Sequence, residues 1–172
     1  MPRNVEIKAR VKDLWVLRER VIALADQDPE LLNQEDTFFG CPSGRLKLRQ
    51  LALDRGELIF YRRADGAGPK ESTYSIYLTV SPEALAGVLS AALGVVGVVR
   101  KQRMLYRTGQ VRIHLDKVEG LGNFVELEVV LRPEQTVEEG VLLANALMQR
   151  LGIPPEDLVA GAYLDLLSPK PT

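Results

Sequence analysis

Hydrophobic and polar residues alternate along much of this chain, beginning within its first ten residues. In the segment NVEIKARV, residues 4–11, the apolar side chains share one face, and Glu6, Lys8 and Arg10 share the other. A period of two is typical of a strand with one buried face. The same analysis predicts six further strands, over residues 45–53, 57–65, 72–80, 98–107, 110–118 and 123–131.

Three segments with helical periodicity lie between these strands, over residues 13–25, 81–93 and 136–152. Asp13 and Ser81 are suited to be N-caps, and Thr136 with Glu139 has the spacing of a capping box. Gly152 is suited to end the last helix. No linker of disordered composition interrupts the series. We therefore expect one α+β domain over residues 1–172, dominated by antiparallel pairing, with residues 167–172 as a flexible tail.

Composition narrows the functional classes. The chain has 172 residues, of which 46% are hydrophobic and 26% charged, values that are ordinary for a soluble globular domain. A formal net charge of −1 argues against a general polyanion binder. The single cysteine, Cys41, excludes an internal disulfide and is typical of a cytoplasmic protein. The most apolar stretch, residues 85–99, is too short to span a membrane, so no membrane partner is expected.

The polar faces of the predicted strands carry mainly ionisable residues, and the charges are segregated by strand. Arg45, Lys47 and Arg49 form a basic face, whereas Glu126 and Glu128 form an acidic one. These faces could simply be solvated, as in a sheet covered by helices on one side only. Alternatively, a barrel with its apolar side outward would bring all of them into one lumen.

Enclosed charges of both signs need a partner, because isolated buried charge is very costly. A polyphosphate that carries a divalent metal satisfies both signs at once. Arginine and lysine bind phosphate oxygens. Carboxylates bind Mg²⁺ or Mn²⁺, and residues two apart on a strand, such as Glu126 and Glu128, present both carboxylates on one side.

The residues also resemble a known family. The segments VEIK, RLKLR, YRRAD, VRKQR, VRIHLD, GLGNFVELEV and YLDLL occur in order from residue 4 to about residue 167. This ordered set is similar to the CYTH superfamily of triphosphate tunnel metalloenzymes, which includes class IV adenylate cyclases, thiamine triphosphatases and inorganic triphosphatases. The resemblance implies an eight-stranded antiparallel closed barrel, the triphosphate tunnel, with helices packed outside it.

The resemblance also implies roles for particular residues. Phosphate contacts would come from Lys8, Lys47, Arg49, Arg63, Lys101, Arg103 and Arg112, with Arg62 as the competitor of Arg63. The metal ligands would be Glu6, Asp116, Glu126 and Glu128, and the catalytic set would be Glu6, Lys8 and Glu128. One position departs from the family's opening motif Glu-x-Glu-x-Lys, because Asn4 stands in place of the first glutamate. The neutral side chain of Asn4 supplies no carboxylate at this position, which argues against a full two-metal arrangement.

The implied function is phosphoryl or nucleotidyl transfer, dependent on Mg²⁺ or Mn²⁺, on ATP, tripolyphosphate or thiamine triphosphate. Water is the nucleophile in a triphosphatase, and the ribose 3′-hydroxyl is the nucleophile in a cyclase. A non-catalytic module that binds polyphosphate, nucleotides or phosphorylated ligands is the alternative. A nucleic-acid binder is disfavoured by the net charge and by the acidic pair Glu126 and Glu128. His114 shares the inward register and is expected to pack rather than act as a general base, and a homodimer is possible.

Overall fold

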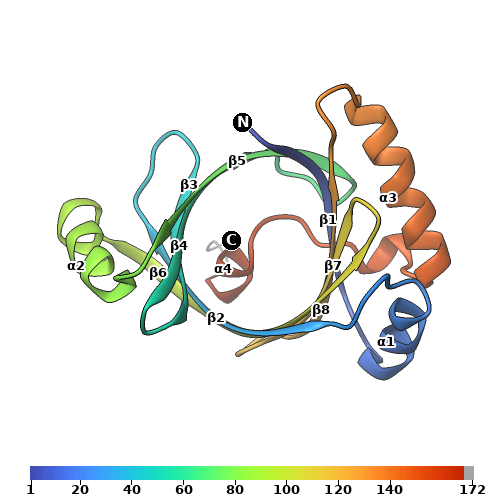
Figure 1. Ribbon diagram of the computed structural model, residues 1–172, viewed down its shortest axis with the longest axis horizontal. Coiled ribbons are helices and arrows are strands. Elements are labelled where there is room, and N and C mark those ends of the chain that lie inside the picture. The colour runs from blue at the N-terminus through green and yellow to red at the C-terminus, as the bar shows by residue number, and fades with distance from the viewer. Residues whose placement is uncertain (169–172) are drawn as a thin grey trace.

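A closed antiparallel barrel forms the centre of the protein (Figure 1). The computed structural model describes residues 1–168. The strands follow the order β1-β5-β4-β3-β2-β6-β7-β8, and β8 closes the barrel by pairing with β1. Their bounds are β1 Arg3–Arg10, β2 Glu30–Phe39, β3 Arg45–Ala52, β4 Arg55–Arg63, β5 Lys70–Thr79, β6 Val95–Thr108, β7 Val111–Val118 and β8 Gly122–Val130. The expected eight-stranded barrel is therefore confirmed.

Seven of these strands correspond to the seven predicted from alternation, but β2 was not predicted. Its sequence, ELLNQEDTFF, places polar residues on both faces and ends in two adjacent phenylalanines. A period-two analysis therefore finds no apolar face in it. The strand is specified by its neighbours instead, because β2 pairs along most of its length with β6 and, at its C-terminal half, with β3.

The helices are α1 Leu14–Ile22, α2 Pro82–Leu93, α3 Val137–Leu151 and α4 Tyr163–Leu167, with a 3₁₀ turn at Pro155–Asp157. Asp13 caps α1 by accepting bonds from two backbone amides, and Thr136 and Glu139 form the expected capping box. Gly152 ends α3 in the left-handed conformation, with φ of 68°. Ser81 precedes α2, but its side chain makes no capping bond. Helix α1 is also shorter than the helix predicted over residues 13–25.

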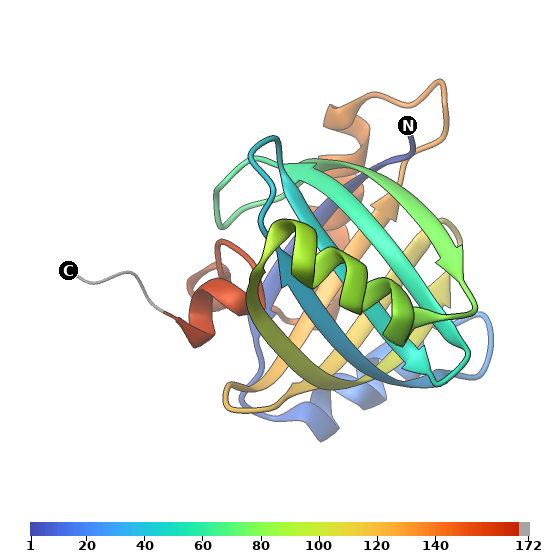
Figure 2. The same cartoon turned by 90° about the vertical axis from the view of Figure 1, so that its left-hand side faces the viewer.

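The main hydrophobic core lies outside the barrel, between its wall and two helices. The outward faces of β1, β7 and β8 contribute residues that are almost fully buried, among them Val5, Ile7, Ile113 and Leu127. Helices α1 and α3 cover this face, whereas α2 lies on the opposite side of the barrel (Figures 1 and 2). Because apolar residues point outward, the inward faces of the strands are left for the charged residues.

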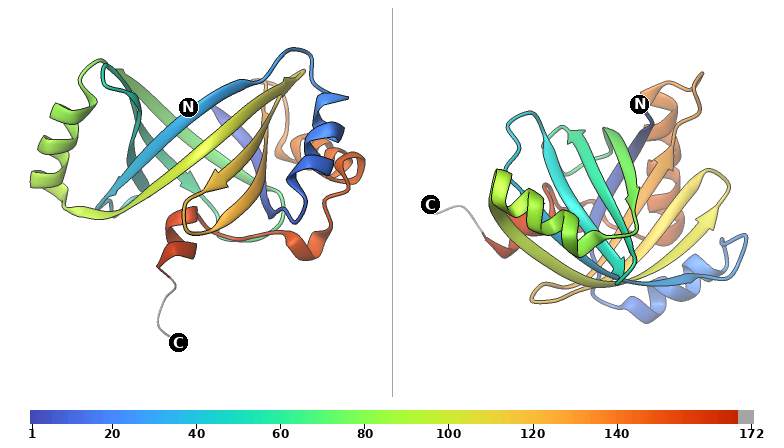
Figure 3. Two further views of the ribbon diagram at one scale, coloured as in Figure 1. Left: turned by 90° about the horizontal axis from the view of Figure 1, so that it is seen from below. Right: turned by 60° about the vertical axis from the view of Figure 1, so that its left-hand side comes forward.

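The short helix α4 closes one end of the barrel. Figure 1 shows it within the ring of strands, and Figure 3 shows it beyond one rim. Leu164 packs in a second apolar cluster with Phe38, Val99 and Phe124. It lies directly against Gly97, where any side chain would collide with it. The opposite end of the barrel has no such helix in the described part of the chain.

Two expectations concern the chain ends and membranes. Leu167 still belongs to α4, and the part of the expected tail at residues 169–172 lies outside the described residues. No helix within residues 1–168 combines the length and the apolar character needed to cross a bilayer.

Truncation of the outer core should lower stability much more than truncation of a surface leucine. Leu127→Ala removes a side chain with no exposed surface between the barrel wall and the covering helices. We expect it to lower the free energy of unfolding by about 2–5 kcal/mol, measured by urea denaturation. The matched control Leu142→Ala, on α3 and 70% exposed, should change it by less than about 0.5 kcal/mol. Equal effects would contradict a core outside the barrel.

Candidate active site

The barrel encloses a cavity of about 650 Å³ that receives side chains from all eight strands. Because side chains alternate along a strand, the charged residues two apart in the sequence all point inward. Ten of the predicted site residues line this cavity: Glu6, Lys8, Lys47, Arg49, Arg63, Lys101, Arg103, Arg112, Glu126 and Glu128. Asp116 does not line it and lies behind Arg103. The structure thus brings the predicted residues into one place, while their roles remain predictions.

A buried aspartate that the sequence analysis did not select organises the basic wall. Asp36, on β2, has no exposed surface and binds three cations at once. Lys47 Nζ lies 2.9 Å and Lys101 Nζ 3.0 Å from its Oδ2, while Arg49 donates from Nε at 2.8 Å and Nη2 at 2.9 Å. One carboxylate therefore fixes three of the seven predicted phosphate ligands.

The charge state of this cluster follows from burial and from its own ion pairs. Burial alone would raise the pKa of Asp36, but Arg49, Lys101 and Lys47 hold that pKa well below its usual range. Lys101 loses its proton more easily than an exposed lysine does. Burial lowers its pKa to about 7, with Asp36 opposing the shift and the neighbouring Arg49 and Arg103 adding to it. Additional negative charge in the cavity would restore the proton.

A second buried pair joins the barrel wall to the closing helix. Arg103 and Asp116 form a bidentate pair with N–O distances of 2.7 and 2.6 Å, and the hydroxyl of Tyr163 donates to the same carboxylate at 2.7 Å. Both oxygens of Asp116 are thus already engaged. A metal-ligand role for Asp116 would require this pair to open, so the arrangement favours a role in positioning Arg103.

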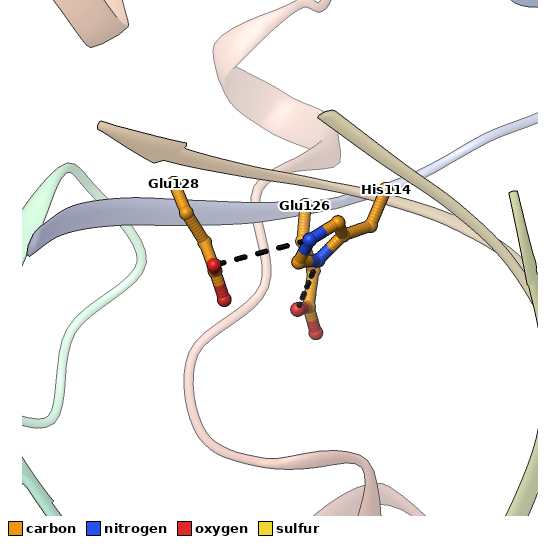
Figure 4. Close-up of side chains that lie close together, drawn as sticks. All are labelled: His114, Glu126 and Glu128. Atoms are coloured by element: carbon orange, nitrogen blue, oxygen red, sulfur yellow. Dashed lines mark ion pairs between the residues drawn. The ribbon is translucent and has the colours of Figure 1, made fainter. Parts of the chain in front are cut away.

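The acidic wall is formed by Glu126 and Glu128 on β8, with His114 beside them on β7 (Figure 4). The ligand atoms of these three residues lie within 4.8 Å of one another, close enough to hold one metal ion. His114 Nδ1 is buried and has no hydrogen-bond partner within residues 1–168, and it lies 3.6 Å from Glu126 Oε2. Burial lowers the pKa of His114, with Arg103 adding to the shift, which keeps the ring neutral and able to act as a ligand.

The third carboxylate, Glu6, faces the same wall. It is paired with Glu128 across β1 and β8. Burial raises the pKa of Glu6, Arg63 opposes this, and Glu128 and Glu126 raise it further. A divalent cation would relieve that repulsion, and carboxylate oxygens are the ligands that Mg²⁺ and Mn²⁺ prefer. The donor set at this wall therefore fits a divalent metal.

The remaining predicted ligands complete the ring of charge. Lys8 Nζ lies 3.2 Å from Glu126 and 3.9 Å from the centre of the Tyr163 ring. Arg112 Nε lies 3.0 Å from Glu128 Oε2, but its N–H is not oriented to form a hydrogen bond with that oxygen. Arg63 binds Glu6 and points into the cavity, whereas Arg62 points away and donates to the carbonyl of Ser43. This orientation agrees with the preference for Arg63.

Asn4, at the departure from the family motif, also lines the cavity. It is 3% exposed, and its Oδ1 accepts no hydrogen bond from any residue that the structure describes. The first position of the motif is thus occupied by a neutral oxygen that is free to accept a bond. It adds no charge to the wall formed by Glu6, Glu126 and Glu128.

Positive charge predominates in the network as a whole. Nine lysines and arginines and seven carboxylates line the cavity within the described chain, and the buried carboxylate of Asp116 lies against Arg103. A bound divalent metal would add to the excess. An anion with several negative charges is therefore the ligand that this cavity is suited to hold.

Two participants in the site carry little local sequence signal. Asp36 lies in the strand without alternation, and the only signal for it is an acidic residue between polar and aromatic ones in QEDTFF. Tyr163 belongs to the segment YLDLL, but nothing local shows that it reaches Asp116, 47 residues away.

Removal of the buried aspartate should destabilise the protein. Asp36→Asn would leave Lys47, Arg49 and Lys101 crowded together without their shared counter-charge. We expect a loss of about 3–5 kcal/mol in the free energy of unfolding at pH 7, measured by chemical denaturation. The control Asp28→Asn, at an exposed position before β2, should be nearly neutral. A similarly small loss for Asp36→Asn would show that the three cations do not depend on it.

Comparisons with known proteins agree with this geometry. The PH1012 protein of Pyrococcus horikoshii OT3 is similar to this chain with a TM-score of 0.85 and 25% identity, over 95% of this chain and 98% of its own. A Vibrio parahaemolyticus protein proposed to be an adenylate cyclase gives 0.78 and 19%, over 96% and 97%. A Hippeastrum protein, proposed to be an adenylyl cyclase and described as having a dominant triphosphatase activity, gives 0.67 and 18%, over 98% and 97%.

At these identities, the Vibrio and Hippeastrum proteins show the shared fold alone. None of the curated proteins matches the sequence. The CYTH domain family matches residues 2–163, which is nearly the whole chain. With its closed barrel and inward charges, this protein belongs to the CYTH domain family.

Proposed function

We propose that this protein is a metal-dependent enzyme that cleaves a triphosphate bound inside the barrel. The observation that carries the proposal is the arrangement of charge in one enclosed cavity. A basic wall from β3 and β6 faces an acidic wall from β8, and both lie within a cavity of about 650 Å³. A polyphosphate with a divalent cation has the complementary distribution of charge.

The basic residues would bind and orient the phosphates. Arg49, Lys47 and Lys101 are held by Asp36, so their positions are fixed before a substrate enters. Such preorganisation matters in phosphoryl transfer, where positioning and neutralisation of charge supply most of the rate. Arg103 is fixed in the same way by Asp116.

The acidic wall would hold the metal. Glu6, Glu126 and Glu128 are the ligands, with His114 adjacent and Asn4 as a neutral oxygen at the edge. When bound, Mg²⁺ or Mn²⁺ would polarise the phosphorus under attack and stabilise the oxygen that leaves. Lys8 and Arg112, which pair with these carboxylates, would be freed to bind phosphate oxygens.

Two other functions lead to different observations. A binding module would hold the same ligands without turnover, and the neutral Asn4 is the feature that favours it. Nucleic acid is disfavoured because the basic residues line an internal cavity that is closed at one end by α4, rather than an outer face.

One incubation separates these functions. The purified protein is mixed with tripolyphosphate, ATP or thiamine triphosphate in the presence of Mg²⁺ or Mn²⁺, and the products are identified. Release of phosphate supports a triphosphatase, and release of pyrophosphate with cyclic AMP supports a cyclase. Tight binding without any product would support the module and overturn the proposed enzyme.

Replacement of the Glu128 carboxylate by an uncharged amide tests the metal site. Glu128→Gln retains the shape of the side chain but removes the charge that faces Glu6 and His114. We expect metal-dependent turnover to fall by at least about 100-fold, because a missing ligand weakens transition-state stabilisation. The thermal unfolding temperature should change little. The control Glu138→Gln, exposed on α3, should retain full activity. Full activity of Glu128→Gln would remove this residue from the metal site.

The pH dependence of binding should reflect Lys101. Since burial lowers its pKa to about 7, the free protein loses this proton above about pH 7, and a bound polyanion restores it. Affinity should therefore fall as pH rises, by up to about tenfold per unit between pH 7 and 9.

The measurement is the dissociation constant of tripolyphosphate at several pH values, in EDTA so that no metal-dependent turnover occurs. Ionisation of the ligand itself is the same for every variant. Lys101→Arg, which stays protonated, should give a flatter profile than the native protein. Identical profiles would show that Lys101 does not contact the bound phosphates.

A further inference from the structure

His114 is the only histidine of the chain, and the fold buries it inside the barrel. It is 4% exposed and lines the cavity beside the acidic wall (Figure 4). A buried ring nitrogen ordinarily has a hydrogen-bond partner, because an unpaired polar atom is costly away from water. Nδ1 of His114 has no such partner within residues 1–168, so the position of this ring needs another explanation.

Strand register places the ring against both carboxylates of β8. His114 lies directly opposite Glu126 in the pairing of β7 with β8, and Glu128 lies opposite Arg112. Nδ1 of the ring lies 3.6 Å from Glu126 Oε2, and Nε2 lies 3.8 Å from Glu128 Oε2. Both distances exceed those of ordinary hydrogen bonds, which are about 2.7–3.2 Å. The ring therefore lies between two carboxylates without a hydrogen bond to either.

The same distances suit donors that share one cation. Two donor atoms that each lie about 2.1 Å from an ion are at most about 4.2 Å apart. Both nitrogen–oxygen distances satisfy this limit, and one of the two nitrogens would bind the ion. The whole set lies within 4.8 Å, and repulsion between Glu126 and Glu128 favours the wider separations. A bound cation would relieve that repulsion.

The donors at this wall differ in how available they are. Each carboxylate is already in an ion pair: Glu6 with Arg63, Glu126 with Lys8, and Glu128 with Arg112. A metal ion must compete with these cations for the oxygens, whereas no described residue competes for Nδ1 of His114. A neutral imidazole nitrogen is also the commonest metal ligand among side chains.

We propose that His114 is a direct nitrogen ligand of the metal bound by Glu126 and Glu128, so that the site selects a first-row transition-metal ion over Mg²⁺. Imidazole nitrogen favours transition-metal ions, whereas Mg²⁺ takes oxygen ligands. This inference rests on the proposed function, because it assumes that the metal of the reaction binds at the acidic wall.

The nitrogen ligand can be detected directly, because the chain has one histidine. Native protein loaded with Mn²⁺ is measured by electron spin echo spectroscopy, which detects nitrogen nuclei bound to the paramagnetic ion. We expect the coupling of a directly bound ¹⁴N, which should change to that of ¹⁵N when histidine alone is labelled. Backbone amides keep ¹⁴N in that sample and are the internal control. Bound Mn²⁺ without a histidine coupling would overturn the inference.

Selectivity is measured by calorimetry without triphosphate, using Co²⁺ and Mg²⁺ as ions of similar size. His114→Gln replaces the ring nitrogen by an amide. We expect this variant to lower the affinity for Co²⁺ at least about tenfold and the affinity for Mg²⁺ less than about threefold. Gln34→Met is the matched control, since Gln34 on β2 is also buried in the cavity with an oxygen that no described residue bonds. It should leave the ratio of the two affinities unchanged.

The failures are distinguishable. If His114→Gln lowers both affinities equally, or if Gln34→Met acts like it, the ring only packs in the cavity. This inference is then overturned while the metal-dependent function stands. If neither ion binds the native protein, the proposed function is overturned as well. The isotope measurement needs no substitution, so it decides the question even where His114→Gln does not fold.

Discussion

The neutralisation of buried charge inside the barrel is the interaction on which the rest of the structure depends. Asp36 is the clearest case, since it has no exposed surface and accepts bonds from Lys47, Arg49 and Lys101. Without it, three largely buried cations would lie together without a shared counter-charge, at a cost of several kcal/mol. The other carboxylates do the same for Arg103, Lys8 and Arg63.

Placing charged side chains inside the barrel reverses the usual arrangement of a small barrel. Side chains that fill a barrel of eight strands are ordinarily apolar. Here the apolar side chains point outward and are covered by α1 and α3, as Val5, Ile113 and Leu127 illustrate. The stability of the fold and the chemistry of the cavity therefore occupy opposite faces of the same strands. The two faces are available on one strand because successive side chains alternate.

The excess of cations over carboxylates connects the structure to its proposed function. The ion pairs hold the basic side chains in place without satisfying all of them, so a bound polyanion would add to the network. The closing helix α4 takes part through Tyr163, which contacts Asp116 by its hydroxyl and Lys8 by its ring.

The sequence alone determined the local features. Alternation located seven of the eight strands, the capping residues located α1 and α3, and the segregation of charge indicated an enclosed polar face. It also located most of the cavity residues, because residues two apart on a strand must point the same way.

Only the tertiary structure decided which charges meet. Asp36 lies on β2, which shows no alternation of apolar and polar residues because polar residues occur on both of its faces. This strand is specified by its pairing with β3 and β6. Asp116 is implied as a metal ligand by the family resemblance, and in the folded chain its carboxylate also binds Arg103 and Tyr163, which come from different parts of the sequence. Partners of this kind are set by barrel closure and strand register, and a local pattern contains no information about either.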